Sequence, residues 1–222
     1  MRPILLLIML IPFFVKAETV IALNGYYHNE KAVQLSTKNR IINDIRLANE
    51  ILHFHGINGY RFALGDWQSI EMKVDTFYKP SLDGEAHLAY SKIKGLNKNA
   101  PKRIDFYVRD YLPELDGKVR GVAVQGGNFF ALTYQKQGVY YTFQHELFHL
   151  IGLGDSSLQY PHPYVCGAKV TLMDERHLPS ESKSYYLSDP KVVVNGQQCG
   201  HDVYFDNARR LRELLEERFG SN

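Results

Sequence analysis

The sequence lacks the features that would divide it into several units. It has no long linker rich in proline or serine, no internal repeat and no low-complexity tract, and a long apolar run occurs only at its amino-terminal end. Once residues 1–17 are set aside, about 205 residues remain, enough for one well-packed domain. We therefore expect a single domain over 18–222, built from an N-terminal subdomain (18–152) and a C-terminal subdomain (153–222).

An excess of charge of one sign is also lacking. The formal net charge is +2, and basic residues alternate with acidic ones, as in Arg209–Arg218. Nucleic-acid binding requires a clustered basic face, so we expect no nucleic-acid partner, and an anionic membrane surface is not favoured either.

Residues 1–17 have the pattern of a secretion signal. Arg2 supplies the positive start, Ile4–Val15 is an apolar run, and Val15-Lys16-Ala17 places small or moderate residues at the cleavage positions. A membrane span needs about 20 apolar residues, so this run is short for an anchor, and an uncleaved signal anchor is the alternative. We expect a secreted or periplasmic protein that has no membrane contact once the signal is removed.

Cysteine is scarce, with only Cys166 and Cys199. In an exported chain two cysteines most simply form one disulfide, and a loop of this size would stabilise the fold by about 3–4 kcal/mol in the chain-entropy model. The alternative is a pair of thiolates that bind a metal, but the chain has no CxxC pair.

The strongest chemical signal is the stretch 145–155, which runs H-E-L-F-H-L-I-G-L-G-D. Residues four apart lie on one face of an α-helix, so His145 and His149 can point two imidazole nitrogens at one metal ion. Glu146 lies beside the first histidine and can reach a water held there. An amphipathic helix with two surface histidines is the structural alternative, but it leaves the spacing of the three polar residues unexplained.

The residues after the second histidine supply a helix end and a third ligand. Gly152 can adopt the left-handed conformation that ends a helix, and the chain can then turn back and present Asp155 to the same ion. Zn2+ suits this set, because it accepts nitrogen and oxygen ligands in a tetrahedron and a catalytic site leaves one position open.

This stretch resembles the metzincin zinc peptidases, whose pattern is HExxHxxGxx followed by His or Asp, and the Asp version is similar to the snapalysin-type secreted peptidases. The resemblance implies that His145, His149 and Asp155 bind zinc and that Glu146 is the general base. It also implies a methionine in a tight turn beneath the metal. Met173 is the candidate, because it is the only methionine after the helix.

The resemblance further implies an α+β, metzincin-like fold: a twisted, mixed and mostly parallel sheet with an antiparallel edge strand, a long zinc-binding helix, and an irregular C-terminal subdomain that ends in a helix. Apolar periodicity and turn residues predict the individual elements. We expect strands at 19–23, 59–64, 70–78, 103–109, 121–125 and 128–134, and helices at 37–55, 84–94, 139–151 and 206–219.

The segment 121–133 lies just before the zinc helix, where metzincins place an exposed edge strand. Unpaired N–H and C=O groups at such an edge can bind an extended peptide as an added antiparallel strand. We predict that 121–133 is the substrate-binding edge, with an ordinary hairpin as the alternative.

The other histidines are weaker candidates. His53 and His55 come at the end of a predicted helix, where solvated positions are favoured over metal binding. His162, His177 and His201 could each supply a fourth metal group or a transition-state donor, although surface or core positions are favoured.

Together these residues predict a zinc-dependent endopeptidase that hydrolyses peptide bonds with metal-activated water, and we expect it to be a monomer that acts on peptide or protein substrates. One alternative is a thermolysin-like zinc peptidase with Glu175 as its third ligand. The other is a non-catalytic exported binding protein on a peptidase scaffold, which the retained Glu146 disfavours.

Overall fold

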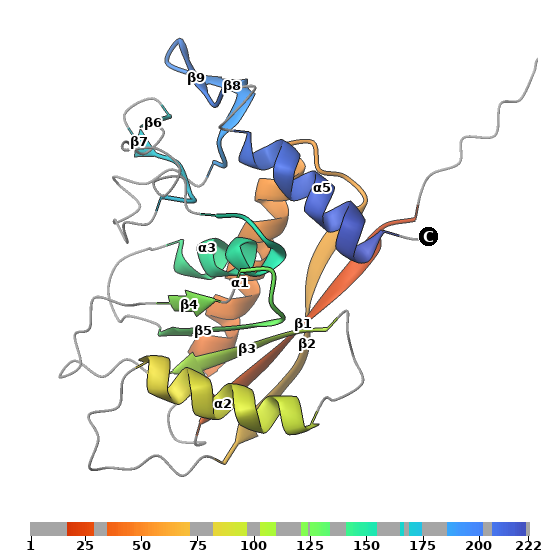
Figure 1. Cartoon of the computed structure of the whole chain (residues 1–222), viewed down its shortest axis with the longest axis vertical. Helices are drawn as coiled ribbons and strands as arrows, with labels where there is room; N and C mark the ends of the chain where they lie inside the picture. Colours follow the sequence, from red (N-terminus) through yellow and green to blue (C-terminus); the bar gives the residue numbers. More distant parts are fainter. Residues whose placement is uncertain are drawn as a thin grey trace, which may run out of the picture.

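The computed structural model describes residues 17–28, 35–71, 82–96, 103–109, 121–123, 125–133, 141–154, 165–166, 169–174, 186–201 and 206–220. Within these residues the chain forms an α+β fold with helices on both faces of one sheet (Figure 1). In chain order the elements are β1 (Thr19–His28), α1 (Leu35–Phe54), β2 (Tyr60–Ile70), α2 (Leu82–Leu96), β3 (Ile104–Arg109), β4 (Gly121–Ala123), β5 (Phe129–Thr133), α3 (Thr142–Ile151), β6 (Val165–Cys166), β7 (Lys169–Val170), β8 (Asp189–Val194), β9 (Gln197–Cys199) and α5 (Asn207–Phe219).

The main sheet has five strands in the order β2-β1-β3-β5-β4. The first four of these are parallel to their neighbours, and β4 runs antiparallel to β5. The expected α+β fold with a mixed, mostly parallel sheet is therefore confirmed. The interior strand β3 is buried along its whole length, as expected for a strand covered on both faces.

Alternation along β3 divides the core between two helical layers. Phe106 and Val108 belong to the larger cluster, which includes residues of α1, α3 and α5. Tyr107, between them, belongs to the smaller cluster beneath α2. Successive side chains of a strand point to opposite faces, so a single strand supplies both cores. Figure 1 shows α2 on one side of the sheet, and α1 and α3 on the other.

Two strands continue through glycines that were expected to end them. Strand β1 passes through Asn24 and Gly25 with a register shift, and β2 passes through Gly65. The Asn24 side chain links the strands, because Oδ1 accepts from Asp66 N at 3.0 Å and Nδ2 donates to Ile104 O at 3.3 Å. These glycines therefore permit close approach of the strands, a role that composition does not distinguish from a turn.

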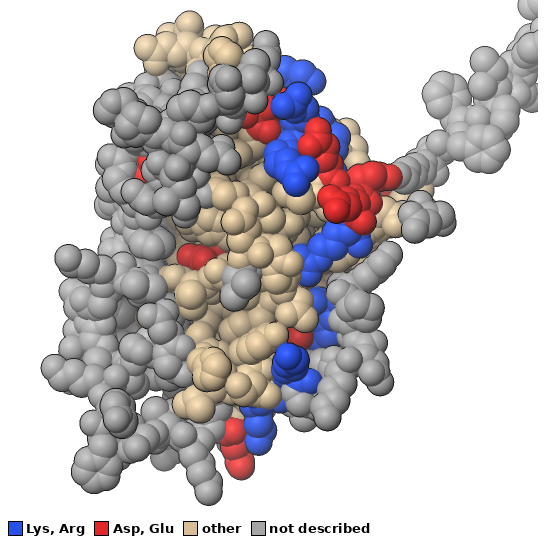
Figure 2. Space-filling view, viewed as in Figure 1, with Lys and Arg blue, Asp and Glu red and all other residues tan. Residues whose placement is uncertain are grey.

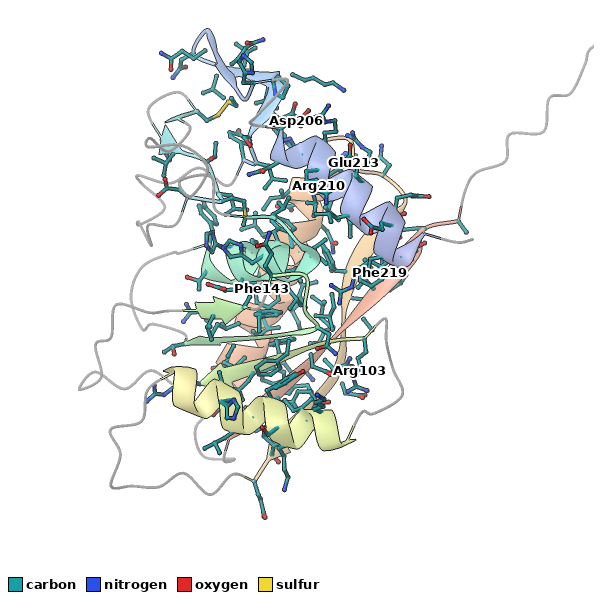
Figure 3. All side chains as sticks on the ribbon, in the orientation of Figure 1. Arg103, Phe143, Asp206, Arg210, Glu213 and Phe219 are labelled. Carbon is teal, nitrogen blue, oxygen red and sulfur yellow. A yellow bond between two sulfur atoms is a disulfide. The ribbon has the colours of Figure 1, made fainter. Side chains whose placement is uncertain are left out.

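The final helix begins and packs as predicted. Asp206 Oδ1 accepts a hydrogen bond from Arg209 N at 2.7 Å and caps α5. Ala208, Leu211, Leu215 and Phe219 are buried on one face. Arg210 and Glu213 lie on the exposed side of the helix (Figure 3). Figure 2 shows charged side chains of both signs gathered along the side of the molecule where α5 lies, while the middle of this face is mostly uncharged.

The two cysteines form the expected disulfide. Cys166 in β6 is bonded to Cys199 in β9, and both are buried. A disulfide of this kind is compatible with an extracellular or periplasmic location. Within the described part of the chain, no helix is long and apolar enough to cross a membrane. Residues 1–16 of the predicted signal, and most of the strand expected at 70–78, lie outside the described residues.

The prediction that His55 is solvated is wrong. His53 is exposed, but His55 is only 5% exposed and lies between the end of α1 and the start of β8. His55 Nδ1 is 2.8 Å from Asp189 Oδ2, and its Nε2 accepts a hydrogen bond from Leu187 N at 3.1 Å. Partners 132 and 134 residues further along the chain cannot be inferred from the helix pattern alone.

This burial predicts acid-sensitive stability. Burial lowers the pKa of His55 below its usual value of 6.5, and the hydrogen bond with Asp189 opposes the shift without reversing it. The folded state thus binds fewer protons than the unfolded state. The contribution of neutral His55 to the free energy of unfolding is therefore fully present above pH 6.5 and is lost as the pH falls through the lowered pKa. We expect the free energy of unfolding, measured by denaturant titration, to fall between pH 7.5 and 5.

The control for this experiment is the exposed histidine on the same helix. A His53→Ala variant should keep the wild-type dependence on pH, whereas His55→Phe should show a shallower one. Equal slopes for His55→Phe and the wild type would contradict the assignment.

Candidate metal centre

Helix α3 is fixed on the sheet by its apolar side. Phe143 points from α3 towards the strands (Figure 3), with its ring centroid 5.6 Å from that of Phe106 and 5.4 Å from that of Phe130. Leu147 and Leu150 are fully buried in the same cluster. The helix begins at Thr142, after the non-helical Tyr141, so its observed start is later than the expected residue 139.

The two histidines of α3 meet, as their spacing predicts. His145 Nε2 is 2.9 Å from His149 Nε2, and the rings are nearly perpendicular at 85°. His145 is buried and His149 is partly exposed. The pair therefore brings two imidazole nitrogens to one point.

A backbone carbonyl fixes the tautomer of each ring. His145 Nδ1 donates to Leu172 O at 2.9 Å, and His149 Nδ1 donates to Leu153 O at 2.7 Å. A carbonyl oxygen can only accept, so each neutral ring carries its proton on Nδ1 and a lone pair on Nε2. Two lone pairs that face each other at this distance repel unless a proton or a cation lies between them.

A zinc ion fits this donor set. Zinc–nitrogen distances of about 2.0–2.1 Å and a tetrahedral angle separate two ligand nitrogens by about 3.3–3.4 Å, a few tenths of an ångström more than the observed separation. Metal-binding histidines commonly donate their other ring N–H to a backbone carbonyl, and both rings do so here.

Glu146 lies against the edge strand of the sheet. Its side chain is buried, and a Cβ atom added at Gly121 of β4 would lie 2.5 Å from Glu146 Oε1 and 2.7 Å from Cδ. Only a residue without a side chain leaves room for the carboxylate at this point. The edge strand and the catalytic candidate are thus in direct contact.

A tight turn lies beneath His145. Asp174 N donates to Thr171 O at 3.2 Å and closes the turn, in which Leu172 supplies the carbonyl for His145. Met173 is the next residue and is fully buried in the main core. The methionine named from the sequence therefore lies in a turn beside α3.

The end of α3 is shaped for a sharp change of direction. Gly152 has φ of 127°, and its N–H donates to Phe148 O and His149 O. A side chain at this position would be strained by φ and would crowd Leu214. The reversal brings Leu153 O to the ring of His149.

The turn between β4 and β5 is tied to the same helix end. Gly126 N donates to His149 O at 3.1 Å, and Gln125 Nε2 donates to Gly152 O at 2.8 Å. The hairpin that carries the edge strand is thereby held in position relative to both histidines. Within the described sheet, β5 lies between β3 and β4, so β4 is the edge strand of this pair, and the expected edge over 121–133 is limited to Gly121–Ala123.

The structure brings together His145 and His149, and places Glu146 of the same helix against β4, but it does not test the third ligand. Asp155, its rival Glu175, and the two histidines His162 and His177 lie outside the described residues. The remaining candidate is His201, which is exposed. Among the residues that the structure describes, no group of three or more His, Cys, Asp or Glu side chains could hold a metal ion.

Sequence reasoning missed three supports of this site. The carbonyls of Leu172 and Leu153 have no signature, because any residue type supplies a carbonyl. Gly121 gave only a weak signal, because it is the first residue of a short predicted strand that precedes the helix of His145 and His149.

Comparisons with known proteins show the fold alone. No protein-family model matches the chain, and no curated protein matches it. A solved structure described as "Structure of a chaperone-substrate complex" is similar, with a TM-score of 0.60 and 15% sequence identity. The similarity covers 90% of this chain and 34% of that one, so this chain spans about a third of the length of that neighbour.

The predicted membership of the metzincin peptidases is wrong. Neither a family model nor a curated protein supports it, and the part of the chain that is described contains no metal-binding group of three residues. The physical reason is that the motif reports spacing along one helix, whereas a family is defined by the whole chain. The contacts of His145, Glu146 and His149 do not depend on that assignment.

Proposed function

We propose that this chain is an exported zinc-dependent endopeptidase. The observation that carries the proposal is the pair of Nε2 atoms of His145 and His149, 2.9 Å apart, with each Nδ1 proton directed at a carbonyl. This arrangement leaves two lone pairs facing one point, which is the arrangement of two ligands of one cation. Asp155, two residues beyond Leu153, is the third ligand in this proposal.

The chemistry follows from the group beside the ligands. Zinc bound there would lower the pKa of a bound water to about 7 and polarise the carbonyl of a peptide bond. Glu146 accepts the proton of the attacking water and later delivers it to the leaving amine. The carboxylate is held for this role between α3 and the edge strand.

The substrate lies along β4 in this proposal. Within the described residues, β4 pairs with β5 on one side, and we place an extended peptide along its other side. Gly121 is on this strand and in contact with Glu146, which would place a peptide bond paired at β4 next to the general base.

Export is the remaining part of the proposal. The disulfide between Cys166 and Cys199 is typical of an oxidising compartment, and the first 17 residues have the pattern of a signal that would lead there.

Gly121→Ala is expected to lower kcat by about 100-fold, because a displacement of a catalytic group by about 1 Å can have an effect of that size. The added methyl group would push the carboxylate of Glu146 from its position, while both histidines stay in place. Zinc affinity should therefore be unchanged. The control is Gly154→Ala, where, among the described residues, a Cβ atom would meet only Gln125 Nε2 at 3.6 Å. Equal kcat in Gly121→Ala and the wild type would rule out this placement of the base.

The proposed function is tested by digestion of a mixed protein substrate, such as casein, with the zinc-loaded protein, with and without a chelator. We expect new peptide termini that a chelator abolishes and added zinc restores. Zinc binding without cleavage of any substrate would instead favour the non-catalytic binding protein. Cleavage that survives complete removal of metal would overturn the proposal.

A further inference from the structure

His55 connects two parts of the chain that are distant in sequence. Its Nδ1 donates to Asp189 Oδ2, and its Nε2 accepts from Leu187 N, so both ring nitrogens are used by the segment 186–189. Beside it, Phe54 stacks on Tyr186 with ring centroids 4.5 Å apart. The end of α1 therefore holds this segment through two hydrogen bonds and one aromatic contact.

The same segment holds the turn beneath the metal centre. Leu172 N donates to Tyr186 O at 2.9 Å, and Leu172 O accepts from His145 Nδ1 at 2.9 Å. A single residue thus joins the segment anchored by His55 to the ring of a proposed zinc ligand. Leu172 and Leu187 are both fully buried, so each link is shielded from water.

We propose that His55 is a positioning residue of the metal centre, which orients His145 through Leu187, Tyr186 and Leu172. This inference rests on the proposed function, because it assigns a support to the same site. The hydrogen bonds of His55 go to Asp189 and Leu187 and not to His145 or His149. It acts by holding the carbonyl that keeps the proton of His145 on Nδ1 and its Nε2 available to a cation.

The link operates only while His55 is neutral. A protonated ring would carry a hydrogen on Nε2, facing the N–H of Leu187, and that hydrogen bond would be lost. The charged groups around the ring are Asp189 of β8, Asp206 before α5, and Arg212 of α5, which also donates to His55 O at 3.1 Å. The two carboxylates favour the protonated ring, whereas Arg212 and burial oppose it.

The direct test is the zinc affinity of His55→Phe, which keeps an aromatic ring and removes both nitrogens. Above pH 7.5 we expect zinc to bind about 10–100-fold more weakly than to the wild type, the usual effect of removing an outer support of a metal ligand. The ratio of the two dissociation constants should fall towards one as the pH is lowered through the pKa of His55, because the protonated wild type has lost the same hydrogen bond. His53→Ala is the matched control and should bind zinc as the wild type does.

A purely structural role gives a different result. In that case His55→Phe would unfold more easily, but its folded form would bind zinc like the wild type, or the ratio would not change with pH. Either result would overturn the inference and leave the proposed function intact. Failure of the wild type to bind zinc would overturn both.

A second measurement decides the matter if His55→Phe does not fold. In the wild type, the amide resonances of Leu187 and Leu172 should shift with the same midpoint as the His55 ring during a pH titration followed by NMR. An amide of Leu172 that does not respond at the His55 midpoint would contradict the link.

Discussion

Replacement of Glu146 by glutamine is expected to lower kcat by a factor of about 10²–10⁴, the usual contribution of a general acid–base group, while zinc stays bound. Glutamine has nearly the same shape as glutamate and can occupy the space against Gly121. It cannot accept a proton from water or return one to the leaving amine. The two histidines and their carbonyl partners are unchanged, so metal affinity should not fall.

The measurement is kcat on a fluorogenic peptide, together with zinc content by metal analysis of the same sample. Glu213→Gln is the matched control, because it makes the same chemical change on the exposed side of α5. Its kcat should equal that of the wild type. If Glu146→Gln cleaves as fast as the wild type, Glu146 is not the base. If it loses zinc, the carboxylate holds the metal instead.

Removal of either histidine is expected to have the second large effect. His145→Ala or His149→Ala should weaken zinc binding by more than the factor of about 10–100 that outer-shell changes cause, because each substitution removes a direct ligand. The remaining imidazole keeps its carbonyl partner but has no second nitrogen at 2.9 Å. Proteolytic activity should fall below detection at zinc concentrations that saturate the wild type.

Competition with a zinc-binding dye measures this effect. His87→Ala on the exposed surface of α2 is the control, and it should bind zinc like the wild type. Wild-type affinity in both His145→Ala and His149→Ala would show that the ion, if bound, sits elsewhere.

The sequence predicts those parts of the fold that depend on local patterns. Helix α5 has an aspartate cap and an apolar face at regular spacing, and both are found as expected. Helix α1 was expected at 37–55 and spans Leu35–Phe54, for the same reason. The ends of β1 and β2 were predicted wrongly, because Gly25 and Gly65 permit close packing of Trp67 and Asn24 rather than turns.

The same distinction between local patterns and long-range contacts applies to the candidate site. The meeting of His145 and His149 follows from four-residue spacing on one helix, so it could be predicted. The partners of their Nδ1 atoms come from a turn and a helix end that only the folded chain brings near. His55 was misjudged because its partners lie more than 130 residues away. The family assignment failed for a related reason, since one helical motif carries no information about the remaining chain.

Binding of one zinc ion by His145 and His149 is tested most directly by the zinc content of the exported, purified protein after equilibration with zinc and removal of excess metal. We predict one equivalent of zinc per folded chain, and none in the double variant His145→Ala/His149→Ala. A wild-type chain that folds and retains no zinc, or a double variant that keeps a full equivalent, would contradict it.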